Sequence, residues 1–421
     1  MKSSFYEYPI FKEMLSVKVT LDLYATVALA LFFFYIGSII KNHLKFLRKF
    51  CIPTPVVGGI LFAVINLIFH QYNILHLKLD AVFQNLCMVA FFTSIGYSAS
   101  MKTVRKAGKP IILLTVSTAI LITMQNIIGG YTAVALGLPK LLGLCLGSIP
   151  LVGGHGNAGA FGPQIQSMGI NSATTVAIAG ATFGLVFGSL LGGPAADFLI
   201  RKFKLSGTNV VEKTLEVENE GEGSTDELKI SEKEFISHVM LMAFHIFISM
   251  AFGVVLNVLI KRSTGITIPV FLCSMLVAVV IRNISDYTHL YPTYEREGNI
   301  AGSISLNIFL ALAMMSVELW QLIDLAVPMA IILLVQVITT TAYVVLVTFP
   351  LMGKDYEAAV MCAAQIGYGF GATPNAMMNI ATVEEKYSPA PQSRLVVPFV
   401  GGLFTSLINA ALITTFINLF A

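Results

Sequence analysis

The stretch LLGLCLGSIPLVGGHGNAGAFGPQI, residues 141–165, decides how this chain folds. It opens a run of 56 residues, 141–196, that contains no Asp, Glu, Lys or Arg. As one helix, this run would be about 84 Å long, whereas the hydrocarbon core of a bilayer is about 30 Å thick. Because glycines and Pro150 interrupt its first part, we expect 141–165 to form a re-entrant hairpin.

The composition of the whole chain shows that a lipid bilayer is its solvent. Its 421 residues are 56% hydrophobic and only 12% charged, with a mean hydropathy of +0.80. Soluble domains carry about 25% charged residues. We therefore expect an all-α polytopic membrane protein without nucleic-acid partners. Its scattered Cys and His residues form no transition-metal motif. With no nucleophile–base pair and no cofactor motif in the sequence, an enzyme is not expected.

Ten charge-poor stretches are long enough to be membrane spans. They are residues 22–40, 53–70, 82–100, 110–131, 172–200, 235–260, 267–284, 298–317, 324–349 and 394–419. Residues 355–383 are broken by glycines and a proline in the same way as 141–165, which predicts a second re-entrant hairpin. Residues 204–234 carry nine Asp and Glu and predict a flexible linker between a first repeat, 1–203, and a second, 235–421.

The two halves of the chain resemble each other at a nearly constant register. Since each half has five spans, the second repeat must be inverted, as in many secondary transporters. Basic residues concentrate in loops 41–49, 101–109 and 201–204, so the positive-inside rule places the linker in the cytoplasm and both termini outside. Corresponding residues lie 214, 211 and 215 positions apart, namely Pro55 and Pro269, Gln125 and Gln336, Gly156 and Gly371.

The glycine runs of the two hairpins are the candidate substrate-binding elements. Broken helices expose backbone amides that suit a carboxylate and carbonyls that suit Na⁺. Close helix packing through small residues is the alternative explanation for either run. The candidates are Gly153, Gly154, His155, Gly156 and Asn157 in the first hairpin, and Gly369, Gly371, Ala372, Thr373, Pro374 and Asn375 in the second.

Uncharged polar residues inside the spans are candidate sodium ligands, because polar groups at membrane depth need partners. Helix-to-helix hydrogen bonding explains each of them equally simply, and Thr182 can also bond to its own backbone. For His155, a proton relay and an ordinary hydrogen bond both remain open. The sodium candidates are Gln125, Asn126, Thr182, Gln336 and Asn409.

Several motifs in combination resemble the bacterial sodium:glutamate symporter family. They are IPTPVVGG at 52–59, GSIPLVGGHGNAGA at 147–160, ATFGLVFG at 181–188, GYGFGATPNA at 367–376 and RLVVPFVGG at 394–402. The resemblance implies an inner-membrane homodimer that imports glutamate with Na⁺. It also implies an elevator-type movement, in which the hairpin-bearing bundle shifts past a scaffold formed by the first two spans of each half. The family pattern has Thr where this chain has Asn157 and Asn375.

Two other functions remain open on the residues alone. A Na⁺-coupled di- or tricarboxylate carrier shares the inverted repeats and the glycine hairpins. An anion channel, in which the paired hairpins line a pore, belongs to a different class of membrane protein.

Overall fold

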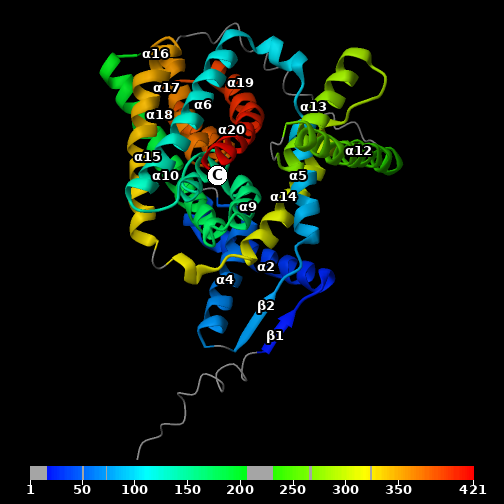
Figure 1. Cartoon of the computed structure of the whole chain (residues 1–421). Coiled ribbons are helices and arrows are strands. Elements are labelled where there is room, and N and C mark those ends of the chain that lie inside the picture. The colour runs from blue at the N-terminus through cyan, green and yellow to red at the C-terminus, as the bar shows by residue number, and fades with distance from the viewer. Residues whose placement is uncertain (1–16, 50–51, 73, 206–230, 265–267, 323–324) are drawn as a thin grey trace, which may run out of the picture.

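A computed structural model describes residues 17–49, 52–72, 74–205, 231–264, 268–322 and 325–421. Their regular secondary structure is helical apart from one short pair of strands (Figure 1). Most of the predicted linker, 204–234, lies outside the described residues. The long helices pack into two groups, which are described in turn.

The first group contains the first three long helices of each half of the chain. Helix α5 lies inside this group and packs on α13 and α14, while α14 also packs on α2 and α4. The α5 and α13 backbones approach closely at Gly96, where a Cβ would lie 2.2 Å from the Met275 carbonyl oxygen. The members are α2 (Leu23–His43), α4 (Thr54–Gln71), α5 (Val82–Tyr97), α12 (Glu232–Thr264), α13 (Val270–Thr288) and α14 (Glu295–Met315).

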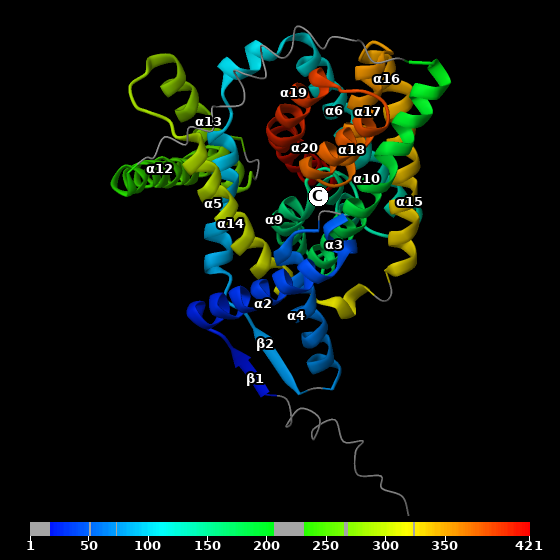
Figure 2. The ribbon, with the colours of Figure 1, turned by 180° about the vertical axis from the view of Figure 1, so that it is seen from behind.

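The second group contains the remaining helices and both predicted hairpins. Helix α10 is its central element and packs on α9, α17 and α18, and α9 lies beside α14 of the first group (Figure 2). The first half contributes α6 (Met101–Ala135), α7 (Lys140–Leu144), α8 (Ser148–Leu151), α9 (Gly154–Ser167) and α10 (Ala173–Phe203). The second half contributes α15 (Ala326–Tyr343), η2 (Val344–Thr348), α16 (Phe349–Leu351), α17 (Tyr356–Phe370), α18 (Thr373–Lys386), α19 (Pro391–Val397), η3 (Pro398–Phe404) and α20 (Thr405–Phe420).

A glycine stripe on α10 sets how closely the second predicted hairpin packs. Gly184, Gly188 and Gly192 recur every four residues and therefore share one face of the helix. A Cβ on Gly184 would lie 2.0 Å from the carbonyl oxygen of Phe370, and one on Gly188 would lie 3.0 Å from that of Gly367. The α17 backbone therefore lies directly against α10. Any side chain larger than hydrogen at these glycine positions would occupy the space that the α17 backbone fills.

Nine helices within the described residues are long and apolar enough to cross a membrane. They fall on nine of the ten predicted spans. The third predicted span, 82–100, is the exception, because its helix α5 ends at Tyr97 and has only 16 residues. Helix α6 begins earlier than predicted and is kinked at Gly108, where the backbone leaves the helical region with φ +72°. The expected scaffold was the first two spans of each half. In the structure the third long helix of each half, α5 or α14, packs with these spans as well.

The strands were not foreseen in the sequence. Strand β1 (Val17–Thr20) pairs in parallel with β2 (Leu75–Lys78), with Val17 opposite Leu75 and Thr20 opposite Lys78. The pair lies at one end of the molecule, beside α2 and α4 (Figure 1). Two short helices remain: α3 (Lys45–Lys49), which packs on α2, and η1 (Leu319–Leu322), which contacts α4 of the first group and α10 of the second.

Candidate functional site

The breaks in the two predicted hairpins meet inside the second group of helices. The first break, at Gly153 and Gly154, separates α8 from α9, and the second, at Gly371 and Ala372, separates α17 from α18. Gly154 has a left-handed backbone with φ +58°, and a Cβ there would lie 3.0 Å from the carbonyl oxygen of Gly371. Only glycine permits both the backbone angle and the close approach. The amino-terminal ends of α9 and α18 are thereby brought together.

Each break is followed by a buried asparagine. Asn157 packs against Gly153, where a Cβ would lie 2.1 Å from Asn157 Nδ2, and Asn375 packs against Gly371 in the same way at 2.6 Å. Asn375 Nδ2 donates to the carbonyl oxygen of Leu185 at 2.9 Å. Asn375 Oδ1 and Asn157 Nδ2 are buried and have no hydrogen-bond partner among the described residues. Each break therefore holds a carboxamide with unused hydrogen-bonding capacity.

The predicted sodium candidates Gln125 and Gln336 lie together where α6 crosses α15. Gln336 Nε2 donates to the backbone oxygen of Gln125 at 2.7 Å. Gln125 Nε2 donates to the backbone oxygen of Gly369 at 3.0 Å and to Thr340 Oγ1 at 3.1 Å. Both Oε1 atoms are buried without a donor in the described part of the chain. Helix-to-helix hydrogen bonding is thus present, and two carboxamide oxygens are left without a donor, that of Gln125 on a side chain bonded to Gly369 before the second break.

Ser148 joins two further candidates, Asn126 and Asn409. Asn126 Oδ1 accepts from Ser148 N at 3.1 Å and from Ser148 Oγ at 2.9 Å. Asn409 Nδ2 donates to the backbone oxygen of Ser148 at 3.1 Å. Ser148 was not among the residues predicted from the sequence, although its position two residues before Pro150 in a glycine-rich stretch was a usable signal.

Thr182 and His155 form a third pair. His155 is only 4% exposed, and its Nε2 lies 3.0 Å from Thr182 Oγ1. Thr182 also donates to the backbone oxygen of Ile178 at 3.2 Å. Thr182 therefore bonds to the backbone of its own helix, as the alternative explanation expects, and also contacts His155 in the first break.

A cavity of about 450 Å³ lies between the two helix groups, lined by residues of α5, α14 and η3. Phe91 and Gly402 line it. Phe91 Cε1 would lie 3.5 Å from a Cβ on Gly156, and Thr373 Oγ1 would lie 3.8 Å from a Cβ on Gly402. Pro374 is in the first turn of α18, where its missing N–H costs no hydrogen bond. Two lining residues of the cavity, Phe91 and Gly402, therefore lie next to residues of the two predicted hairpins, whereas no hairpin residue lines the cavity itself.

A buried network of hydroxyl and carboxamide groups, which was not predicted from the sequence, connects α6, η2 and α17. The signal in the sequence was the recurrence of these polar residues within apolar spans. One of the connected elements, η2, is a π-helical segment, and such segments are frequent at functional sites. Thr118 Oγ1 lies 2.8 Å from Tyr368 OH, and Ser117 Oγ lies 2.7 Å from Thr348 Oγ1. The other members are Tyr343 and Gln365.

The electrostatics of the breaks come from dipoles and neutral groups. Neither 141–196 nor 358–383 contains a charged residue. The ion pairs of the second group lie at helix ends, where Asp197 contacts Arg201 and Lys386, and Glu384 contacts Arg394. An anion at the breaks would therefore meet backbone amides and helix amino termini, whose dipoles favour negative charge.

Nine apolar helices of spanning length, among the described residues, and a neutral buried meeting of two helix breaks define a multi-pass membrane protein with an interior polar site. Comparison with known proteins then gives its family. The model of the Sodium/glutamate symporter family matches residues 19–389, and the chain belongs to that family. This confirms the resemblance found in the sequence and the expectation of a transporter rather than an enzyme.

Curated relatives cover almost the whole chain. The sodium/glutamate symporter of Haemophilus influenzae is 36% identical over 395 residues, which is 94% of this chain and 96% of the relative. That of Escherichia coli is 36% identical over 400 residues, which is 95% of this chain and 98% of the relative. Among solved structures, a sodium proton antiporter from Methanocaldococcus jannaschii matches 95% of this chain and 98% of its own, with 12% identity and a TM-score of 0.39.

Proposed function

We propose that this chain imports glutamate with Na⁺ across a bacterial inner membrane, using the two helix breaks as the substrate site. Its family supports Na⁺-coupled glutamate transport. The observation that carries the site is the contact between Gly154 and the Gly371 carbonyl, which brings two helix amino termini to one place. Glutamate has two carboxylates, and each amino terminus offers unpaired amides and a favourable dipole to one of them.

The carboxamides beside the breaks complete the substrate site. Asn157 Nδ2 is a free buried donor that suits a carboxylate oxygen, and His155 is held next to it in the first break by Thr182. The remaining hairpin residues, Gly153, Gly156, Gly369, Ala372, Thr373 and Pro374, give the breaks their shape and their close approach. The acid is thus held without a buried formal charge.

Sodium would be held by the carboxamide oxygens that have no donor. Oxygen atoms exposed by broken helices are the usual ligands of coupling ions in transporters with this kind of site. A cation there lowers the electrostatic cost of the nearby anion, which couples the two bindings. Among the described residues the buried oxygens without a donor include those of Gln125, Gln336, Gln365, Asn375 and Asn409. Asn126 and Thr182 position neighbouring groups.

For the transport step we propose that the second helix group moves past the first as an elevator, in a homodimer. The cavity lined by Phe91 and Gly402 supports this, because it separates the two groups beside the breaks. The hairpins would be re-entrant and the repeats inverted, with both termini outside. Residues 204–234 would then be a cytoplasmic linker.

The membrane potential would contribute to the driving force if transport moves net charge. One net charge moved through 100 mV is worth about 2.3 kcal/mol, or about 50-fold accumulation.

Uptake of labelled L-glutamate into proteoliposomes tests the proposal. An inward Na⁺ gradient should drive accumulation, and Asn157→Leu should abolish it while Asn157→Thr, the residue of the family pattern, preserves it. Uptake that ignores the Na⁺ gradient would refute the coupling. Competition by citrate or malate without competition by glutamate would favour a di- or tricarboxylate carrier instead. Single-channel currents without counterflow would favour an anion channel.

A further inference from the structure

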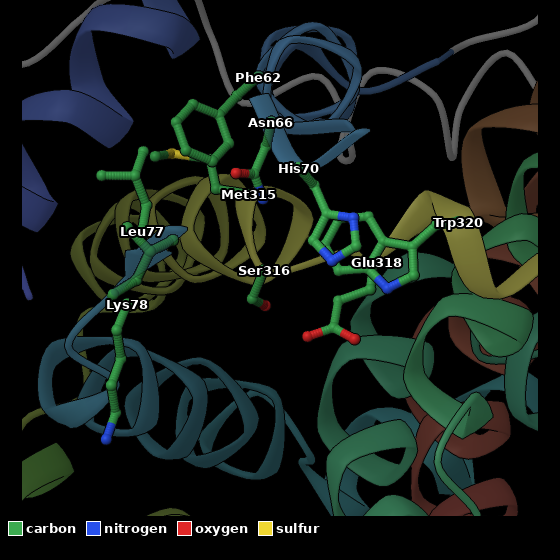
Figure 3. Close-up of a pocket in the computed structure, with 10 residues that line it drawn as sticks. Phe62, Asn66, His70, Leu77, Lys78, Met315, Ser316, Glu318 and Trp320 are labelled. Atoms are coloured by element: carbon green, nitrogen blue, oxygen red, sulfur yellow. The ribbon is translucent and has the colours of Figure 1, made fainter. Parts of the chain in front are cut away.

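A second cavity of about 450 Å³ lies at the end of the molecule that carries the strands, away from the helix breaks. It is bounded by α4, β2, the end of α14 and η1, and it shares no lining residue with the cavity beside the breaks (Figure 3). Its volume is within the range of small-molecule sites, about 300–1,000 Å³. Phe62, Leu77, Leu79 and Met315 make part of its lining apolar, while most of its other residues carry polar groups.

One wall of this cavity carries an acid without a cationic partner. Glu318 is half-buried, and its carboxylate points into the cavity in Figure 3. Gln321 Nε2 donates to one of its oxygens, and no Lys, Arg or His pairs with it within the described residues. The backbone N–H of Glu318 donates to Thr175 Oγ1 at 3.3 Å, which fixes the segment that presents it. A carboxylate held this way is a site for an ammonium group.

The adjoining wall is a flat aromatic stack with unused donors beside it. The His70 and Trp320 rings are parallel within 6°, with centroids 4.0 Å apart. The indole Nε1–H of Trp320 and the carboxamide of Asn66 make no hydrogen bond with any described residue, and Figure 3 shows Asn66 directed into the cavity. Indole is a donor only, and a carboxamide offers two N–H groups, so both suit a carboxylate.

The opposite end carries a base without an acidic partner. Lys78, the last residue of β2, is exposed and forms no ion pair with the rest of the described chain. In Figure 3 its side chain runs to the side of the cavity away from Glu318. Its flexible four-carbon stem lets the ammonium reach a ligand bound between the two ends.

We propose that this cavity binds an α-amino acid in its zwitterionic form. Glu318 takes the ammonium group, while Asn66, Trp320 and Lys78 donate to the carboxylate, and the apolar part of the lining accepts the side chain. A simple amine would leave the donors unused, and a simple carboxylate would face Glu318 without compensation, so both charges of the ligand are needed. This site is separate from the proposed transport site at the helix breaks, and the proposal does not depend on it.

Occupation of this site acts on the connection between the two helix groups. Helix η1 lies in the segment that joins α14 of the first group to α15 of the second. The His70–Trp320 stack attaches η1 to α4 of the first group. A ligand that bridges Glu318 and Lys78 ties η1 to β2 as well, which makes the site a regulatory one.

Trp320 is the only tryptophan of the chain, so intrinsic fluorescence reports on this cavity directly. The full-length protein in nanodiscs is titrated with L-glutamate, L-leucine, n-butylamine and glutarate. We expect a saturable change in emission with both amino acids. The amine and the diacid should each need at least about tenfold higher concentrations, because each leaves one charged group unpaired.

Variants identify the groups that bind. Glu318→Gln should weaken both amino acids at least about tenfold and leave glutarate unweakened, and Glu318→Asp should restore part of the affinity. Lys78→Gln should weaken the amino acids and glutarate but not n-butylamine. Lys78 is exposed, so its variant folds even if Glu318→Gln does not. Lys102→Gln, a change of another lysine outside the cavity, is the matched control and should change nothing.

Asn157→Leu separates this proposal from the transport function. It should abolish uptake and leave the Trp320 response intact. A response lost in Asn157→Leu but kept in Glu318→Gln would mean that Trp320 senses the helix breaks, and it would overturn the proposal. Equal binding of n-butylamine, glutarate and the amino acids would overturn it too, as would the lack of any saturable response to amino acids.

Discussion

Substitution of Gly184 by alanine tests one of the closest backbone contacts among the described residues. A Cβ at this position would lie 2.0 Å from the Phe370 carbonyl oxygen. Carbon and oxygen settle at about 3.3–3.6 Å, so α10 and α17 must separate by about 1.3 Å. Overpacking of this kind costs about 1–3 kcal/mol. This exceeds the gain of about 1 kcal/mol that alanine brings to a helix interior. The expected result is a less stable protein.

Gly188→Ala is the matched control, one turn further along the same stripe. Its Cβ would lie 3.0 Å from the Gly367 carbonyl oxygen, so a shift of about 0.3 Å suffices. The helical gain then roughly cancels the contact cost, and stability should change by less than about 0.5 kcal/mol. Reversible unfolding of both variants in mixed micelles measures the difference. Equal unfolding midpoints, or a more stable Gly184→Ala, would refute the packing argument.

The same variant should impair transport. Leu185, the residue after Gly184, accepts the hydrogen bond from Asn375 Nδ2 at 2.9 Å. A separation of α10 from α17 therefore displaces the carboxamide of the second break. We expect Gly184→Ala to reduce glutamate uptake several-fold more than Gly188→Ala at equal amounts of folded protein. An unchanged uptake rate in Gly184→Ala would contradict the link between this packing and the site.

Three further changes test other parts of the structure. Gly154→Ala should reduce uptake at least tenfold, whereas Gly137→Ala, with a similar φ of +77° and no atom within 4 Å of its Cβ, should cost about 1 kcal/mol of stability and spare uptake. Ser148→Ala removes the hydroxyl donor to the α6 carboxamide, so the Na⁺ concentration for half-maximal uptake should change several-fold; an unchanged value would exclude Asn126 from sodium coupling. Arg282→Met should destabilise the protein by about 3–5 kcal/mol in a thermal or detergent unfolding assay, because the Arg282 side chain is only 7% exposed and its partner is left unpaired.

The breaks could be located from the sequence because membrane physics leaves few options for a charge-free run of 56 residues. Glycines and prolines then show where the helix stops. The structure adds a local likeness between the two breaks. Gly156 was set against Gly371 in the sequence, whereas Gly153 and Gly371 are the glycines that each pack against a buried asparagine four residues later. The spacing G-x-x-x-N-A, at 153–158 and 371–376, was the signal of this likeness.

The polar candidates were found because polar side chains in apolar helices stand out, but their partners were not. Tertiary packing decides which helix crosses α6 at Gln125 and Asn126. The sequence alone therefore could not pair Gln125 with Thr340, or Asn126 with Ser148. The shortness of α5 was missed for a related reason. Ser98 and Ser100 are uncharged and so did not end the charge-poor stretch, yet the chain turns there. The substrate and sodium roles of these residues remain predictions.

The parallel pairing of β1 with β2 bears on how the chain is made. Parallel strands require a crossover, and here α2 and α4 form that crossover, so the two ends of the segment from Val17 to Lys78 are hydrogen-bonded to each other. Leu21 N also donates to the Lys78 carbonyl oxygen at 2.9 Å, which continues the attachment up to the start of α2. The strand pairing that holds the outer ends of α2 and α4 together can therefore form before any later helix has left the ribosome. For this reason we expect α2 and α4 to be the first part of the protein to assemble in the membrane, and to serve as the surface on which α14 later packs.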